Sequence, residues 1–118
     1  MNIFQKKVAL FCAIEEREER VFLPEIVIPE VASGLFRATK DGDFVSRYLR
    51  SLRSVPNFSF VAIDSHLADL AVWLITKTGL RGADAMYAAL AFYYELILIT
   101  LDKEQLEKAK KIIEVRLP

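Results

Sequence analysis

The segment LILITL at residues 96–101 is the feature that most constrains the fold of this chain. A nearly uninterrupted apolar strand is typical of a parallel sheet that helices cover on both faces. Helical patterns flank it, with DAMYAALAFYYE (84–95) before it and KEQLEKAKK (103–111) after it. Because strands and helices also alternate elsewhere, we predict a three-layer α/β domain, with a mainly parallel sheet flanked by helices.

The other predicted elements follow the same alternation. Strands are predicted at 20–23, 57–63 and 112–117, and helices at 2–18, 29–39, 43–54 and 66–78. Pro29 suits the first turn of its helix, where the missing N–H costs nothing. Ser65 is the predicted N-cap of the helix that Gly79 ends. Asp102 is the predicted N-cap of the last helix, with Gln105 completing a capping box.

Composition limits the class of protein. A chain of 118 residues corresponds to one domain, residues 1–118, and its hydrophobic content of 53% indicates an ordered core. Lys plus Arg and Asp plus Glu number 16 each, so any contact with nucleic acid must be local. The single cysteine, Cys12, excludes disulfides and thiolate metal clusters and suits a cytoplasmic protein. The apolar run 8–14 is too short to cross a membrane, and no cleavage site for a signal peptide follows it.

Three acidic residues occupy comparable positions. Glu30, Asp84 and Asp102 each fall in the first turn, or at the cap, of a predicted helix. Helices that follow parallel strands begin at the carboxyl edge of the sheet, where ligand sites collect. Each acid alone is more simply explained as a helix-start residue, since acids favour helix N-termini. A shared site requires that all three converge, which periodicity cannot establish.

Three stretches of the sequence belong together: FLPEIVIPEVASGLFR (22–37), LRGADAMYAALA (80–91) and LITLDKEQLEKA (98–109). In this order and at similar separations, they resemble the PIN-domain family. This resemblance implies a PIN-like fold and a metal-dependent nuclease that usually acts on RNA. Many members are toxins of VapC-type toxin–antitoxin pairs, so the resemblance also implies an antitoxin protein as a partner.

The resemblance also implies the site. Glu30, Asp84 and Asp102 match the family's acidic pocket for Mg²⁺ or Mn²⁺ and are the predicted metal ligands and catalytic residues. Thr100 matches a hydroxyl residue that often lines this pocket, and Arg81 is the candidate for binding the substrate phosphate through its planar fork. Carboxylates suit these hard cations, and a metal held by them can activate a water molecule, so no nucleophilic side chain is required.

One departure from the family concerns the N-terminus. Members open with a strand that ends in an aspartate, often as DTN or DTS, and this sequence has no such stretch. We therefore expect a gap between the 20–23 and 96–101 strands, or their closure onto each other. One explanation is that the sequence begins at an internal methionine. The other is a truncated relative, a non-catalytic interaction or dimerisation module with an incomplete metal site.

Two further groups of residues bear on function. Arg47, Arg50 and Arg53 recur every three residues and could follow a phosphate backbone, although such a stripe is more often a solvated face. The aromatic residues of the later helices are predicted to lie mainly in the core; they are Trp73, Tyr87, Phe92 and Tyr94. An apolar face that one chain cannot hide, together with unpaired strand edges, predicts a homodimer.

Overall fold

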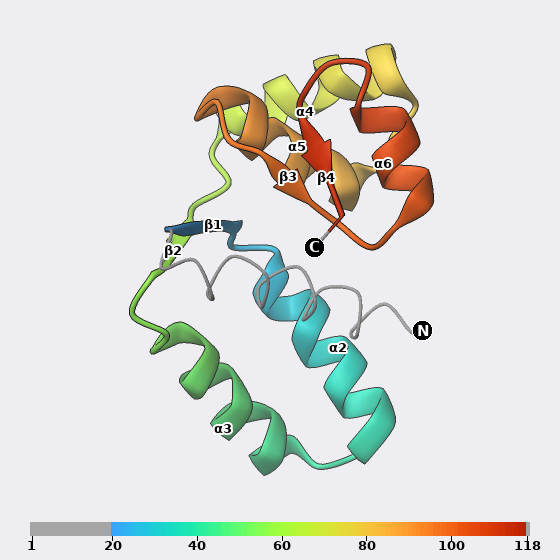
Figure 1. Cartoon of the computed structure of the whole chain (residues 1–118). Helices are drawn as coiled ribbons and strands as arrows, with labels where there is room; N and C mark the ends of the chain where they lie inside the picture. The colour runs from blue at the N-terminus through green and yellow to red at the C-terminus, as the bar shows by residue number, and fades with distance from the viewer. Residues whose placement is uncertain (1–19, 118) are drawn as a thin grey trace.

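The computed structural model describes residues 20–117 of the chain, and within them five helices and four strands alternate. In chain order, as labelled in Figure 1, they are β1 (Val21–Pro24), α2 (Val27–Thr39), α3 (Gly42–Arg53), β2 (Phe58–Val61), α4 (Ser65–Thr78), α5 (Gly82–Tyr93), β3 (Leu98–Ile99), α6 (Lys103–Ala109) and β4 (Val115–Arg116). This order confirms the predicted α/β class. The predicted helix at 2–18 lies outside the described residues.

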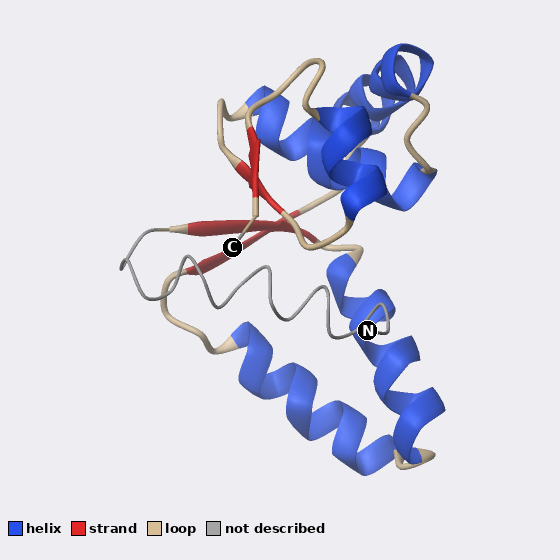
Figure 2. Ribbon diagram, turned by 45° about the vertical axis from the view of Figure 1, so that its right-hand side comes forward, coloured by secondary structure: helices blue, strands red, loops and turns tan. Residues whose placement is uncertain are grey.

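The strands form two separate parallel pairs. In one pair Val21 of β1 lies opposite Phe58 of β2, and in the other Leu98 of β3 lies opposite Val115 of β4. Within residues 20–117 no hydrogen-bonded strand joins the two pairs, which run in different directions in Figure 2. The parallel arrangement was predicted, and the separation agrees with the expected gap between β1 and β3.

The apolar segment 96–101 was predicted as one covered strand, and this was wrong in extent. Only Leu98 and Ile99 pair with β4, and Ile97 is 36% exposed. The preceding Glu95 has a positive φ of 54°, and the Leu96 N–H donates to the Ala91 carbonyl at 2.8 Å. The first residues of the segment therefore turn the chain out of α5, because their backbone groups are used in that turn.

The helices divide between the two strand pairs. In Figure 1, α2 and α3 form a hairpin below β1 and β2, while α4, α5 and α6 surround β3 and β4. Helix α5 packs closely on α4 and also touches β1, so it joins the two halves. All residues from Ala85 to Ala91 are buried, and the four alanines among them allow this close approach. None of the helices α2–α6 has the length and apolar character needed to cross a bilayer.

The caps of α4 differ in part from the prediction. Asp64, and not Ser65, is the N-cap, since its side chain accepts a hydrogen bond from the Leu67 N–H at 2.9 Å. Ser65 is instead the first helical residue. Gly79 is confirmed as the C-cap, with a φ of 75° that favours glycine.

The prediction of aromatic core residues was right for one of four. Tyr87 is 4% exposed, but Trp73, Phe92 and Tyr94 are 42%, 39% and 44% exposed. Trp73 lies one position off the buried stripe of α4, which includes Ala71 and Leu74. Phe92 and Tyr94 come after the last buried residue of α5. Helical spacing identifies a common face but does not reveal whether another element covers it.

Candidate functional site

The three predicted acidic residues all lie where a helix begins. Glu30 is in the first turn of α2, which follows β1, and Asp102 caps α6, which follows β3. Asp84 is in the first turn of α5. We call the first turns of these three helices, with their three carboxylates, the acidic end; the name refers to the ends of the helices and not to an end of the molecule. Helix N-termini carry partial positive charge, which favours anionic side chains there.

Asp84 is not the cap of its helix. The helix begins at Gly82, two residues earlier than predicted, and the cap residue Arg81 makes no side-chain capping hydrogen bond. Asp84 therefore occupies the third helical position, where its negative charge interacts favourably with the helix dipole although it is not the N-cap. This corrects the prediction that Asp84 opens the helix.

Tyr87 connects Glu30 with Asp84. Its hydroxyl donates a hydrogen bond to Glu30 Oε1 at 2.9 Å, across 57 positions of sequence. The pKa of Tyr87 lies far above its ordinary value. Burial is the largest cause, followed by the charge of Glu30, the hydrogen bond to Glu30 and the charge of Asp84. Glu30 and Asp84 thus act on the same phenol. Sequence reasoning placed Tyr87 only in the core, although its position three residues after Asp84 sets both on one helix face.

Asp102 is confirmed as the N-cap of α6. Its Oδ1 accepts hydrogen bonds from the backbone N–H groups of Glu104 and Gln105, at 3.0 and 3.3 Å. The predicted capping box is absent from these contacts, because the Asp102 N–H donates to Thr100 Oγ1 at 2.9 Å. Thr100 is buried, so its hydroxyl fixes the turn between β3 and α6.

Gln105 links the first turn of α6 to the first turn of α5. Its buried side-chain amide donates to the Asp84 backbone carbonyl in a long contact of 3.5 Å, instead of reaching back to Asp102. One residue therefore receives its backbone cap from Asp102 and contacts the backbone of Asp84. The two aspartates are related through this glutamine, which the sequence suggested only as part of a capping box.

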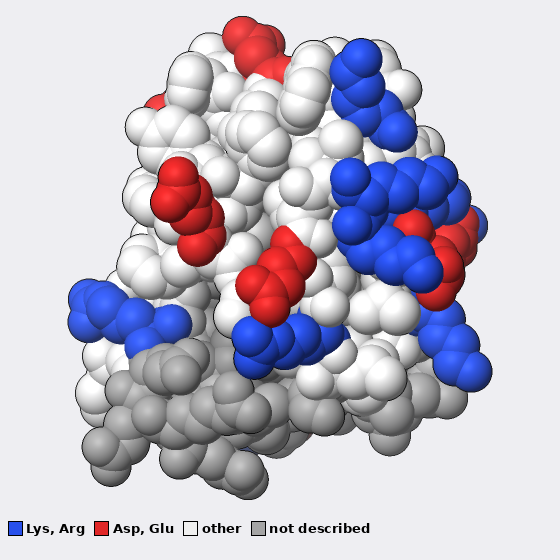
Figure 3. All heavy atoms as spheres, turned by 45° about the horizontal axis from the view of Figure 1, so that its top comes forward, with Lys and Arg blue, Asp and Glu red and all other residues white. Residues whose placement is uncertain are grey.

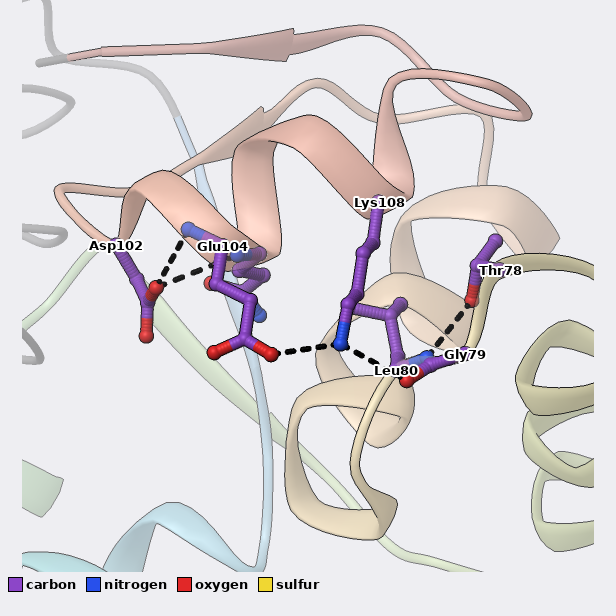
Figure 4. Close-up of polar contacts among 7 residues, drawn as sticks. Thr78, Gly79, Leu80, Asp102, Glu104 and Lys108 are labelled. Carbon is purple, nitrogen blue, oxygen red and sulfur yellow. Dashed lines mark hydrogen bonds and ion pairs between the residues drawn. The ribbon is translucent and has the colours of Figure 1, made fainter.

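Lys108 fixes the loop that leads into α5, as Figure 4 shows. Its ammonium group donates to the Gly79 carbonyl at 3.2 Å and to Glu104 Oε1 at 2.6 Å. The pKa of Glu104 is lowered, first by the hydrogen bond and charge of Lys108 and then by the charge of Arg81. Arg81 therefore places an exposed positive charge beside the start of α6, at the margin of the acidic end.

The arginine stripe of α3 belongs to another part of the surface. Arg53 forms a two-bond ion pair with Glu25, with distances of 3.1 and 2.8 Å. Arg47 and Arg50 line a shallow depression together with Asp41 and Asp43. Nearby acids thus balance the stripe, which agrees with a solvated face.

The described residues do not form a closed metal cage. Among residues 20–117, no three His, Cys, Asp or Glu side chains lie close enough together to hold a metal ion. Tyr87 donates a hydrogen bond to Glu30 and lies three residues after Asp84 in α5. Their assignment as ligands with Asp102 stays a prediction, as do the substrate contacts of Thr100 and Arg81. The carboxylate oxygens fit hard cations such as Mg²⁺ and Mn²⁺.

Comparison with known proteins agrees with the sequence resemblance. A crystal structure of PAE2754 from Pyrobaculum aerophilum is similar, with a TM-score of 0.65 and 27% identity, over 90% of this chain and 83% of that one. No curated protein matches the chain significantly. The family description "PIN domain" matches residues 5–111, which is most of the sequence. With its alternating helices and parallel strands, the chain belongs to the PIN-domain family.

Proposed function

We propose that this protein is a metal-dependent ribonuclease in which Glu30, Asp84 and Asp102 hold Mg²⁺ or Mn²⁺. The observation that supports this most directly is the hydrogen bond from Tyr87 to Glu30, which ties α2 to α5, where Asp84 lies three residues before Tyr87. Like charges so placed repel each other, and a divalent cation relieves that repulsion. The nuclease-type fold of the PIN family supplies the class of reaction.

The number of carboxylates is compatible with such a metal. Mg²⁺ is usually bound by one or two carboxylates, with water and substrate phosphate completing its shell. Glu30 and Asp84 can supply these two ligands, while Asp102 contributes from the cap of α6. A bound metal would activate water and stabilise the leaving oxygen.

Other residues of the acidic end have roles in substrate binding in this proposal. Arg81 is exposed at the start of α5 and would bind a phosphate of the RNA backbone. Thr100 would support the same pocket through the turn that it fixes before Asp102. The balanced charge of the chain limits the RNA contact to this region. We further propose a cytoplasmic location and a role as the toxin of a pair whose antitoxin protein covers the acidic end.

The test compares the chain with its Asp84→Asn variant. We expect millimolar Mn²⁺ to raise the unfolding temperature of the wild type but not of the variant, because a ligand that binds only the folded state stabilises it. Without metal the variant should be slightly more stable, since one repelling charge is gone. Cleavage of single-stranded RNA should require both Asp84 and the metal.

Asp69→Asn on the exposed face of α4 is the matched control, since it removes the same charge away from the acidic end. It should keep the full response to Mn²⁺. If Asp84→Asn responds to Mn²⁺ as strongly as the control does, Asp84 is only a helix-start residue and the proposal fails.

A second candidate function is an interaction module that forms a homodimer. Five exposed rings form what we call the aromatic surface; they are His66, Trp73, Phe92, Tyr93 and Tyr94. Centroid distances of 5.4 Å for His66–Tyr93, 4.9 Å for Tyr93–Tyr94 and 5.5 Å for Trp73–Phe92 show how closely they gather. Exposed aromatic residues in contact are typical of protein interfaces. Dimerisation through this surface is compatible with nuclease activity, since the acidic end is at the opposite end of α5.

A further inference from the structure

We infer that the exposed face of α6 binds the phosphate backbone of a single-stranded RNA that extends from the acidic end. This inference rests on the proposed function, because RNA is taken as the substrate, and it adds the path that the strand follows. Helix α6 begins at the acidic end, where Asp102 caps it. A strand bound along α6 therefore continues directly from the proposed site.

Three charged residues form one row on this face. Lys103, Glu107 and Lys111 are spaced four residues apart, which places them above one another on a helix. The C-cap residue Lys110 has a φ of −61° and a ψ of −15°, so the helical backbone continues as far as the row does. All three residues are exposed, and the row therefore lies on the outer face of α6.

The central acid of the row is bonded to a lysine outside it. Glu107 pairs with Lys110 at 2.7 Å. Among the ion pairs of residues 20–117, none includes Lys103 or Lys111. These two lysines lie about 12 Å apart along the axis, by the rise of 1.5 Å per residue, so each can contact a different phosphate of one strand.

Arg81 adds positive charge where the row meets the acidic end. The pKa of Glu104 is lowered first by Lys108 and then by the charge of Arg81, so the exposed guanidinium group stands near this carboxyl group at the start of α6. Glu104 is itself paired with Lys108 at 2.6 Å. In Figure 3, Lys and Arg side chains gather on the side where Figure 1 places α6, with acidic side chains among them.

A nucleic-acid backbone fits this face better than a protein surface does. Phosphates repeat along a strand, and separate lysines can each neutralise one of them. Within residues 20–117, the large hydrophobic residues that are exposed all lie outside α6, so this face offers a protein partner little apolar area.

The test measures the binding of a short fluorescein-labelled oligouridylate by fluorescence anisotropy in EDTA, so that cleavage plays no part. Lys103→Gln combined with Lys111→Gln should weaken binding several-fold. The slope of the logarithm of the association constant against that of the KCl concentration should fall in magnitude by about 1.4, because each phosphate contact of a single strand contributes about 0.7. Glu107→Gln, which removes the central negative charge, should tighten binding.

Arg47→Gln combined with Arg50→Gln is the matched control, since it removes the same charge from the exposed face of α3. Its affinity and its salt slope should equal those of the wild type. If this control weakens binding as much as the α6 variant does, RNA responds only to net charge and the inference is overturned. Polyglutamate, which represents an acidic protein surface, should displace the RNA poorly, and efficient displacement would also overturn it.

Cleavage in the presence of Mn²⁺ is assayed separately. If RNA binds along α6 and no metal supports its cleavage, the proposed function fails and the inference stands. If cleavage depends on Asp84 and Mn²⁺ while the α6 variant binds RNA as the wild type does, the proposed function stands and the inference fails.

Discussion

The two ends of α5 differ in almost every physical respect. At its start, Asp84 lies three residues before the buried Tyr87; one hydrogen bond runs from α5 to α2, and another reaches α5 from α6. About 15 Å further along the helix axis, by the rise of 1.5 Å per residue, Tyr93 and Tyr94 stand in solvent. The intervening segment 85–91 is buried throughout. One helix thus presents a polar, closely packed start and an apolar, exposed end.

This contrast suggests a division of tasks. Half-buried carboxylates on neighbouring helix starts suit the binding of a cation, because it offsets their like charge. Exposed aromatic rings suit association, because they bury apolar area when a partner covers them. In Figure 3 most Lys and Arg side chains lie on the side where Figure 1 places α6, and uncharged atoms make up much of the remaining face. A protein partner is therefore more compatible with that remaining face than a polyanion is.

The largest effect is expected in the buried middle of α5, which couples both ends. Leu90→Ala removes a side chain that is 2% exposed and should cost about 2–5 kcal/mol of unfolding free energy, since a cavity remains. Tyr93→Ala, three residues later, should cost about 1 kcal/mol or less, because its ring is already 53% exposed. Urea denaturation of both variants measures this. Equal losses would mean that the two regions are not distinct in packing.

An intermediate effect is expected at the aromatic surface. Trp73→Asp should weaken the proposed homodimer by about 2 kcal/mol or more, which corresponds to about 30-fold in the dissociation constant, because buried tryptophans dominate interfaces. Light scattering over a range of concentrations measures the oligomeric state. The metal response of this variant should match that of the wild type. A wild type that is monomeric at every concentration would exclude the homodimer.

Asp69 and Lys77 allow this dimer to be tested more sharply. Each lies four residues from Trp73 on α4, so an antiparallel pairing of two α4 helices centred on Trp73 sets Asp69 of one copy against Lys77 of the other. In such a dimer Asp69→Lys or Lys77→Asp alone should weaken association, and the two substitutions together should restore it. If the double variant does not regain association, Trp73 is not at the centre of the dimer interface.

The smallest effect is expected at the Glu25–Arg53 ion pair, which is exposed and joins the turn before α2 to the end of α3. Its hydrogen bond from Arg53 holds the pKa of Glu25 below the ordinary value. Because the folded-state pKa is lowered, the stabilisation is complete above the pKa of the unfolded chain and is lost as pH falls through the folded-state pKa. Arg53→Gln should lower the unfolding free energy at pH 7 only slightly, as is typical of exposed pairs. Urea denaturation should show a smaller difference between Arg53→Gln and the wild type at pH 3 than at pH 7.

Local sequence signals predicted much of the fold. The alternation of strand-like and helix-like hydrophobic patterns predicted the α/β class. The capping residues Gly79 and Asp102 predicted two helix boundaries. The same signals placed Glu30, Asp84 and Asp102 at helix starts, where the structure has them. These features depend on residues within about one helical turn of each other, so the sequence contains the information that decides them.

The tertiary structure alone decided how these local pieces meet. The bond between Tyr87 and Glu30 joins residues 57 positions apart, and no periodicity reports such a distance. The same holds for the hydrogen bond of the Gln105 side chain, which goes to the Asp84 carbonyl and not to Asp102. It holds also for the exposure of Trp73, Phe92 and Tyr94. Local patterns determine which face of a helix is apolar, whereas the packing of other elements determines whether that face is covered. By itself the sequence determined the helices and their acidic first turns, and the packing of α5 against its neighbours decided which side chains are brought together.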